Sequence, residues 1–392
     1  MPLQLLVAGG GIGGLASALA LAQAGHGVEV LEQSPVFAEV GAGIQLGPNA
    51  VRRLQMLGLA DALDAIAARP EALVVRSARN DDELACLPLG KAALHRYGAP
   101  YCCVHRADLH GVLLAAAQAH AGIVLNHSAR LAQIALSDEA VAVVTDSAHA
   151  WEGDALIGAD GLWSTVRDSL PEAGDAPRST GHTAWRGLLA QSELPAAQRS
   201  TQVRVWLGDR LHALVYPLRG GELLNVVVLA EAAPTGDARD WDQSTSLGAL
   251  QRATGRCCAT LQGYLAAVPT WRAWTLHDRK PLTGPAQMAH ERIALVGDAA
   301  HPMLPYLAQG AGMAIEDAVA LADSLRDVAS AAVAVALQRY AAARWQRNAQ
   351  VQARALRNAD IFHAAGPLRL GRDLAMRLLG ARLLDQPWLF NH

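Results

Sequence analysis

The sequence predicts an α/β fold: a Rossmann-like nucleotide-binding domain, an inserted antiparallel sheet and a C-terminal helical segment. The first observation is that residues 5–32 follow the order strand, glycine turn, helix, strand. The second is that residues 176–276 alternate strand-like runs with tight turns and carry few helix signals. The third is that residues 293–325 return to the strand–helix pattern, after which residues 331–366 predict one long helix.

These changes of pattern predict a discontinuous arrangement of two domains, which a chain of 392 residues has room for. We expect residues 1–75, 101–175 and 277–330 to form the nucleotide-binding domain. Residues 76–100 and 176–276 are expected to form the substrate-binding sheet domain, and residues 331–392 the C-terminal helical region.

Composition and charge exclude several classes of protein. A net charge of −3 provides no basis for nucleic-acid binding, and no uninterrupted apolar run reaches membrane-spanning length. The N-terminus lacks the basic region of a signal peptide, so we expect a cytoplasmic protein without stable membrane anchoring. The five cysteines are odd in number and fit no C-x-x-C spacing, which predicts free thiols and no metal site.

The first strand runs into three glycines spaced as G-x-G-x-x-G, namely Gly9, Gly11 and Gly14. In this motif the first glycine makes the tight turn, the second lets backbone approach a pyrophosphate, and the third lets the helix pack closely on the strand. The free N–H groups at the start of the following helix favour a negatively charged diphosphate. Glu32 closes the second strand, where its carboxylate would accept a ribose hydroxyl. A bound dinucleotide is therefore predicted.

Two further segments can approach such a ligand. Glycines 41, 43 and 47 share one loop, which indicates backbone lying close to something flat, although an ordinary surface loop is the alternative. Arg106 precedes a predicted helix, where it could bind a phosphate or pair with Asp108, and the residues alone leave both readings open.

Two acids follow buried strands, in Asp160-Gly161 and in Gly297-Asp298. The carboxyl ends of strands are where open α/β sheets bind ligands, although Asp160 could also be a simple turn residue. Gly310, Ala311 and Gly312 begin a helix whose N–H groups would face an anionic or electron-rich ligand edge.

In the inserted sheet, period-two alternation places His212, Leu214, Tyr216 and Leu218 on one face of a strand. His212 and Tyr216 are then roughly 13 Å apart along the strand, so they could flank a ring-sized ligand. A histidine buried in the core is the alternative.

The long C-terminal helix carries basic residues that we expect to form a solvated face, with subunit contact as the alternative, in a monomer or a homodimer. These residues are Arg339, Arg344, Arg347, Arg354 and Arg357.

Taken together, the three motifs resemble those of the group-A FAD-dependent aromatic monooxygenases, in the same order and over nearly the whole chain. The resemblance implies that the Gly9–Gly14 turn and Glu32 bind the ADP part of FAD. Asp160-Gly161 would serve both FAD and the nicotinamide nucleotide, and Asp298 would meet the ribityl and pyrophosphate groups. It also implies that Arg106 contacts FAD, and that residues 41–47 and 310–312 embrace the isoalloxazine ring.

The resemblance further implies the reaction. There is no second G-x-G-x-x-G, so NADH or NADPH would bind only transiently as co-substrate. It would reduce FAD, O2 would add at flavin C4a, and the hydroperoxide would hydroxylate a small aromatic substrate whose ring hydroxyl is ionised.

Within this family, His212, Tyr216 and Gln309 most resemble the 3-hydroxybenzoate 6-hydroxylases, which form gentisate. His212 would be the base for the phenol, while Tyr216 and Gln309 would orient the substrate. Salicylate 1-hydroxylase and 6-hydroxynicotinate 3-monooxygenase are alternatives, and a flavin reductase or desaturase of a lipid-like substrate is an alternative of another class. No arginine stands out as the partner of a substrate carboxylate.

Overall fold

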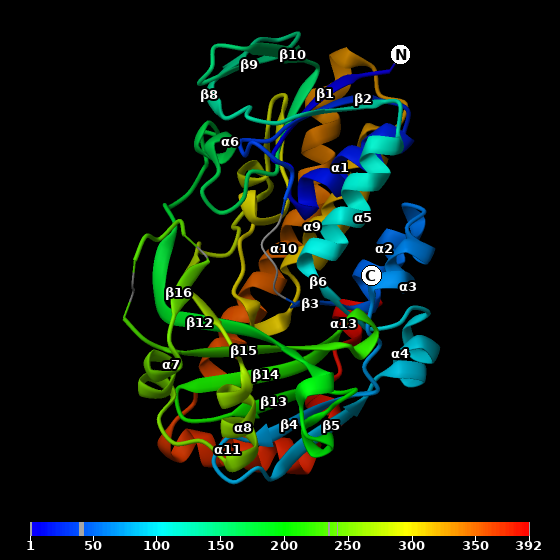
Figure 1. The fold of residues 1–392 in the computed structure, drawn as a ribbon. Helices are drawn as coiled ribbons and strands as arrows, with labels where there is room; N and C mark the ends of the chain where they lie inside the picture. Colours follow the sequence, from blue (N-terminus) through cyan, green and yellow to red (C-terminus); the bar gives the residue numbers. More distant parts are fainter. Residues whose placement is uncertain (1, 39–42, 234–235, 241, 392) are drawn as a thin grey trace.

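The computed structural model describes residues 2–38, 43–233, 236–240 and 242–391, so residues 41 and 42 of the predicted glycine loop lie outside it. Two sheets dominate the molecule, with the six-stranded sheet at one end of Figure 1 and the eight-stranded sheet at the other. The mixture of a parallel sheet, an antiparallel sheet and a helical C-terminus confirms the predicted fold class.

The six-stranded sheet brings the three predicted motifs together. Its order is β18-β19-β11-β1-β2-β7, and all neighbours are parallel except β18 and β19. Because β19, β11 and β1 are adjacent and parallel, the segments that follow them meet at one edge of the sheet. The strands are β1 (Gln4–Ala8), β2 (Gly27–Leu31), β7 (Ile123–Asn126), β11 (Ala155–Gly158), β18 (Ala289–His290) and β19 (Ile293–Leu295).

Helices cover this sheet because their apolar side chains pack on its buried strands. Val7 and Leu15 are fully buried in the shared core, as is Leu321. The covering helices are α1 (Ile12–Gln23), α5 (Arg106–Ala119) and α9 (Gly310–Leu325), and α2 (Pro48–Met56) and α3 (Ala60–Ile66) lie beside them. Short elements complete this end of the molecule: β3 (Gly43–Leu46), β6 (Cys102–His105), β8 (Leu131–Leu136), β9 (Val141–Thr145), β10 (Ala150–Gly153) and α6 (Thr165–Asp168).

The eight-stranded sheet has the order β16-β17-β12-β15-β14-β13-β4-β5 and is antiparallel except where β13 meets β4. Its strands are β4 (Ala72–Ser77), β5 (Glu83–Pro88), β12 (Arg178–Ala190), β13 (Val203–Leu207), β14 (Leu211–Leu218), β15 (Leu223–Glu231), β16 (Gln243–Thr245) and β17 (Trp271–Asp278). The division into domains stays a prediction, and the boundary expected at residue 75 falls inside β4, which pairs throughout with β13 and β5.

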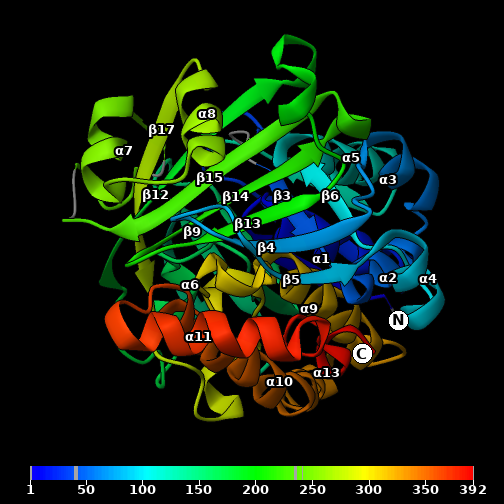
Figure 2. The same cartoon turned by 90° about the horizontal axis from the view of Figure 1, so that it is seen from below.

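Each face of this sheet packs against different helices (Figure 2). One face packs on α7 (Leu247–Thr254) and α8 (Ala259–Ala267) through a core that includes Trp206 and Tyr264. The opposite face points toward the six-stranded sheet and the C-terminal helices. Residues 76–100, which the sequence assigns to the sheet domain, also contain helix α4 (Gly90–Tyr97), which ends at Gly98 in the left-handed conformation (φ 72°).

The C-terminal region is helical as predicted, with α10 (Val333–Phe362), α11 (Gly366–Leu379), α12 (Ala381–Leu384) and α13 (Pro387–Phe390). The expectation of a solvated basic face on α10 is wrong for Arg344 and Arg347, which are 7% and 8% exposed. Both pair with acids of α9, so this part of the helix faces inward. Among the described residues no helix is long and apolar enough to cross a membrane.

Candidate active site

A cavity of about 600 Å³ lies between the two sheets, where the glycine turn, α9 and the inner face of the eight-stranded sheet converge. The predicted site residues that line it are Gly9, Gly11, Glu32, Gly43, Arg106, Asp160, Tyr216, Asp298, Gln309, Gly310 and Ala311. Three others, Gly14, His212 and Gly312, lie behind its walls.

The first glycine turn has room for backbone only. Gly9 has φ +106°, and a Cβ there would lie 2.5 Å from the carbonyl oxygen of Ala159. A Cβ at Gly14 would lie 1.9 Å from the Gly9 carbonyl oxygen, which is the close helix–strand packing expected of the third glycine. Helix α1 begins after Gly11 without a side-chain cap, so its first N–H groups face the cavity. This cradle fits the diphosphate of FAD.

Glu32 lies beside this turn and orders it. Its two carboxylate oxygens accept the backbone N–H groups of Gly10 at 2.7 Å and Ser34 at 2.8 Å. A carboxylate has about four acceptor positions, so Glu32 can also accept a ribose hydroxyl in the cavity.

Asp160 lines the cavity but also caps a helix. Its carboxylate accepts the Ser164 hydroxyl and the backbone N–H groups of Thr165 (2.8 Å) and Val166 (3.1 Å), at the start of α6. Burial raises the pKa of Asp160, although these hydrogen bonds oppose the shift. The turn reading therefore has a structural basis, and the predicted nucleotide role stays a prediction.

The second acidic motif faces the same cavity across the start of α9. Asp298 lines the cavity wall. Gly297 has φ +57°, and a Cβ at this position would lie 2.9 Å from the Cβ of Ala314. Gly310 and Ala311 line the cavity at the N-terminal end of α9, whereas a Cβ at Gly312 would lie 3.4 Å from the Cβ of Ala50 on α2.

Gln309 precedes α9 and is 2% exposed. Its side-chain oxygen accepts the Asn49 amide at 3.0 Å, and the same Asn49 nitrogen donates to Glu316 at 2.7 Å. The Gln309 side chain is thereby connected to a buried ionic network below α9.

That network joins α9 to α10. Arg344 bonds Asp317 at 2.8 Å and Glu316 at 2.9 Å, while Arg347 bonds Glu316 at 2.7 Å. His301, which follows the Gly297-Asp298 motif, contacts Asp317. Burial would raise the pKa of Asp317, but His301 and Arg344 outweigh it and hold this pKa below the usual range. The network therefore fixes the start of α9 against the cavity.

Tyr216 faces the cavity from β14. Its hydroxyl donates to the Gly43 carbonyl oxygen at 2.6 Å, and a Cβ at Gly43 would lie 2.6 Å from the tyrosine ring. Tyr216 thus ties the sheet to the segment at Gly43, and burial raises the pKa of its hydroxyl.

His212 shares the face of β14 with Leu214 and Tyr216 but lies beyond the cavity. Its Nδ1 is 3.0 Å from Nε2 of His363, and its ring packs against Tyr306 with centroids 4.9 Å apart. Its register partner Leu229 does line the cavity, so His212 lies next to the wall. Burial, His363 and nearby positive charge lower the pKa of His212 well below its usual value, which leaves the ring neutral.

Two arginines face the cavity, and the sequence drew attention to only one. Arg106 begins α5 at the cavity wall, and Asp108, its proposed alternative partner, instead receives two hydrogen bonds of 2.8 Å from Arg219. Arg186 on β12 was missed. It is 3% exposed, bonds Asp242 at 2.6 Å and lies 5.1 Å from the ring centroid of Trp274.

Arg186 shares the inner face of the sheet with the other side chains that line the cavity. Arg186 on β12 lies opposite Val227 on β15, and Val227 lies opposite Leu214 on β14. Arg186 and Leu214 are therefore separated by two strand spacings of about 5 Å each. The only sequence signal for this position was its place on the alternating face of a long strand.

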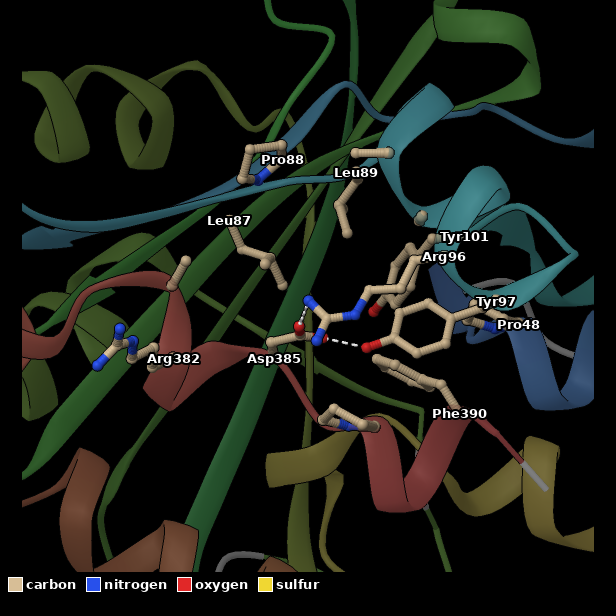
Figure 3. A pocket seen from close by; sticks show the side chains of 14 residues that line it. Pro48, Leu87, Pro88, Leu89, Arg96, Tyr97, Tyr101, Arg382, Asp385 and Phe390 are labelled. Atoms are coloured by element: carbon tan, nitrogen blue, oxygen red, sulfur yellow. Dashed lines mark hydrogen bonds and ion pairs between the residues drawn. The ribbon is translucent and has the colours of Figure 1, made fainter.

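A second cavity of about 520 Å³ lies between α4 and the C-terminal helices (Figure 3). In it the Tyr97 hydroxyl and Arg96 both contact Asp385. Tyr101 lines this cavity and donates to Gln45, which lines the larger one, at 2.6 Å. The glycine turns do not reach this second cavity, which sets it apart from the nucleotide site.

Comparison with known proteins agrees with this geometry. Residues 3–355 match the family model described as "FAD binding domain". The chain is 37% identical over 392 residues to the 3-hydroxybenzoate 6-hydroxylase of Polaromonas naphthalenivorans, covering 99% of this chain and 96% of that protein. It is also 37% identical to a 3-amino-4-hydroxybenzoate 2-monooxygenase of Streptomyces platensis, over 99% and 96% of the two chains. Klebsiella pneumoniae HpxO, solved with FAD and uric acid, superposes with a TM-score of 0.86 at 26% identity, over 97% and 94% of the chains.

Proposed function

We propose that this chain, which belongs to the FAD-binding-domain family and is an FAD-dependent aromatic monooxygenase, converts 3-hydroxybenzoate to gentisate. One oxygen atom of O2 enters the ring at carbon 6 and the other leaves as water, with NADH or NADPH supplying the two electrons. Bound FAD supplies the activation of O2. The residues of this chain bind and orient the substrate, exclude water and accept the phenol proton.

The observation that carries this proposal is the polarity of the cavity's sheet wall. Tyr216 on the sheet and Gln309 at the start of α9 offer hydrogen-bonding groups to the cavity, and Arg186 offers a cation on the same sheet face as Tyr216. A small aromatic acid with one hydroxyl and one carboxylate matches this pattern. A lipid-like substrate has no carboxylate to add to the Asp242 partner of Arg186 and would make no use of this cation.

We assign proton acceptance to His212. In the ion-free protein its Nδ1–H donates to Nε2 of His363, so its Nε2 lone pair is left to accept a proton, and its register partner Leu229 forms part of the cavity wall. A phenolate in the cavity would raise the pKa of His212, because opposite charge favours the imidazolium.

The test is a substrate panel with product identification. The FAD-loaded protein is mixed with NADH or NADPH and with 3-hydroxybenzoate, salicylate, 6-hydroxynicotinate or 3-amino-4-hydroxybenzoate, and the products are separated. We expect gentisate from 3-hydroxybenzoate at close to one per NAD(P)H oxidised. Another panel member giving the higher kcat/KM with coupled product formation would replace the proposed substrate.

The role of His212 is tested separately with His212→Ala. We expect the yield of gentisate per NADH oxidised to fall by about 100-fold or more, the usual contribution of a general base. Undiminished product formation would eliminate the role. His277→Ala is the matched control. His277 lies on β17 and is not among the described residues that line the cavity.

A further inference from the structure

A cluster of three ligand-type side chains lies at the outer end of the substrate-side face of the eight-stranded sheet. It consists of His182 on β12, Glu231 at the end of β15 and His363, which caps α10. One potential ligand atom from each lies within 4.8 Å of the other two. Neither the FAD cavity nor the proposed chemistry uses His182 or Glu231 directly.

The sheet pre-orders two of these three residues. His182 and Glu231 are directly opposite one another in the antiparallel pair of β12 and β15. Directly opposed residues have Cβ atoms about 5 Å apart on the same face, so their side chains point the same way. His363 approaches from α10, with its ring centroid 4.6 Å from that of His182. The site therefore joins the sheet to the C-terminal helix.

The second ring nitrogens of both histidines are already held. Tyr306 Oη lies 2.8 Å from Nδ1 of His182, and His212 Nδ1 lies 3.0 Å from Nε2 of His363. Histidine ligands in metal sites characteristically use one nitrogen for the metal and donate the other N–H to a neighbouring acceptor. Tyr306 occupies that acceptor position for His182, and with an ion bound His212 Nδ1 would accept from the Nε2–H of His363.

The remaining nitrogen of His363 has no use in the fold. His363 is 6% exposed, and its Nδ1 is buried with no hydrogen-bond partner among the described residues. A buried polar atom without a partner is costly and calls for an explanation such as an ion.

We propose that His182, Glu231 and His363 bind a divalent ion of the zinc type. Two imidazoles and one carboxylate form a ligand set that suits Zn²⁺ and leaves a fourth position for water. Nitrogen ligands disfavour Mg²⁺ and Ca²⁺, which prefer oxygen. The 46% exposed side chain of Glu231 gives the ion a route in from solvent and can turn to close the site.

The charged residues around the site affect its affinity for a divalent ion. Arg210 lies 3.7 Å from Glu231 in an exposed pair, and Arg372 contributes positive charge near His363. Asp360 and Asp278 contribute negative charge near His182. Among the described residues, the ion pair that an incoming ion displaces from Glu231 is the exposed one with Arg210, which is weak in water.

The experiment is a calorimetric titration of the FAD-loaded protein with ZnCl2, after treatment with a chelator and its removal by dialysis. We expect one zinc ion per chain in the wild type. Glu231→Gln and His182→Gln should each weaken this binding by about tenfold or more, while MgCl2 should give no binding. Zinc should also raise Tm in the wild type, because it binds only the folded chain.

Glu231→Gln is the decisive variant, since it removes a ligand from an exposed side chain and leaves the core intact. Glu222→Gln, at the opposite end of β15 and also exposed, is its matched control and should bind zinc like the wild type. Equal zinc affinity in the wild type, Glu231→Gln and His182→Gln would overturn the proposal, as would the absence of binding to the wild type. Neither outcome depends on which aromatic compound the enzyme hydroxylates.

Discussion

The end of the cavity at the glycine turn is built from backbone, whereas its end at the eight-stranded sheet is built from side chains. At the glycine turn, Gly9 and Gly14 remove Cβ atoms where another backbone passes, and N–H groups of α1 face the cavity. At the sheet end, Arg186, Tyr216 and Gln309 come from two strands and a loop, and each is held by a partner far away in the sequence. Backbone sites depend on a few contiguous residues, while side-chain sites depend on the whole tertiary fold.

The largest expected effect comes from adding one methyl group to the backbone-built end. In Gly14→Ala the new Cβ would lie 1.9 Å from the Gly9 carbonyl oxygen, so the turn must open. We expect a loss of more than about 3 kcal/mol of unfolding free energy and a nearly colourless purified protein. Chemical denaturation and the flavin absorbance measure both. Flavin content equal to the wild type would show that this turn is not tightly packed.

The control for that variant is Gly111→Ala in the middle of α5. A Cβ there meets nothing within 4 Å, and the position is exposed and helical. Alanine should stabilise the protein by up to about 1 kcal/mol through the backbone entropy of the unfolded chain.

The next effect is expected in the ionic network that supports the side-chain-built end. Asp317→Asn removes the carboxylate that pairs with Arg344 and His301, all buried. A loss of about 3–5 kcal/mol is expected, because it leaves an uncompensated buried charge. Asp323→Asn, in an exposed pair with Arg326, should cost less than about 1 kcal/mol. Similar losses in the two variants would contradict the importance of burial.

The stability lost in Asp317→Asn is expected to depend on pH. The pKa of Asp317 is lowered in the folded protein, so its contribution is fully present above the unfolded pKa of about 3.9. That contribution is lost as the pH falls through the lower folded pKa. The difference in unfolding free energy between wild type and Asp317→Asn should therefore be constant from pH 7 to about 5 and shrink below about pH 4. A difference that grows on acidification would refute this assignment.

A smaller effect is expected for Arg186→Gln. If Arg186 receives the substrate carboxylate, KM should rise by about tenfold or more, since a hydrogen bond to a charged group is lost. The unfolding free energy should also fall, because the variant loses the ion pair with Asp242. Phenol, which lacks the carboxylate, should be oxidised equally by the wild type and by Arg186→Gln. Arg272→Gln removes an exposed arginine of β17 that bonds the Asp242 carbonyl and Ser244, and should leave KM unchanged.

The smallest effect is expected from removing one hydroxyl group, that of Tyr216. Tyr216→Phe removes the hydrogen bond to Gly43 and should cost about 1 kcal/mol, together with some loss of product per NADH oxidised. Tyr264→Phe, on the opposite face of the sheet, removes a hydrogen bond to the Gln198 carbonyl and one received from Arg204. It should lose at least as much stability but keep full coupling, and a loss of coupling in both would indicate a general effect of destabilisation.

The contrast between the two ends also explains what the sequence could predict. Gly9, Gly14 and Glu32 form a short pattern whose physical requirements are local, and they lie where the pattern placed them. The shared face of Leu214 and Tyr216 also followed from strand alternation alone. Local periodicity therefore located the main elements and most of the cavity.

Long-range partners could not be predicted in the same way. Arg344 and Arg347 look like solvated residues until the acids of α9 are placed against them. The position of Arg186 depends on strand order, which no single segment specifies. His212 was placed on the correct face, but its neighbour His363 comes from the end of α10, so its burial depended on a contact that periodicity does not contain.

The strand order of the parallel sheet has a consequence for how the protein is made. β1 and β2 leave the ribosome first, but β19 pairs with β11 only after residue 293 has been synthesised. Asp298, Gly310 and the helix α10 that supports them follow later still. The cofactor pocket is therefore completed near the end of translation, after all strands of the inserted sheet have been synthesised. Chains truncated before α10 should accumulate as cofactor-free protein.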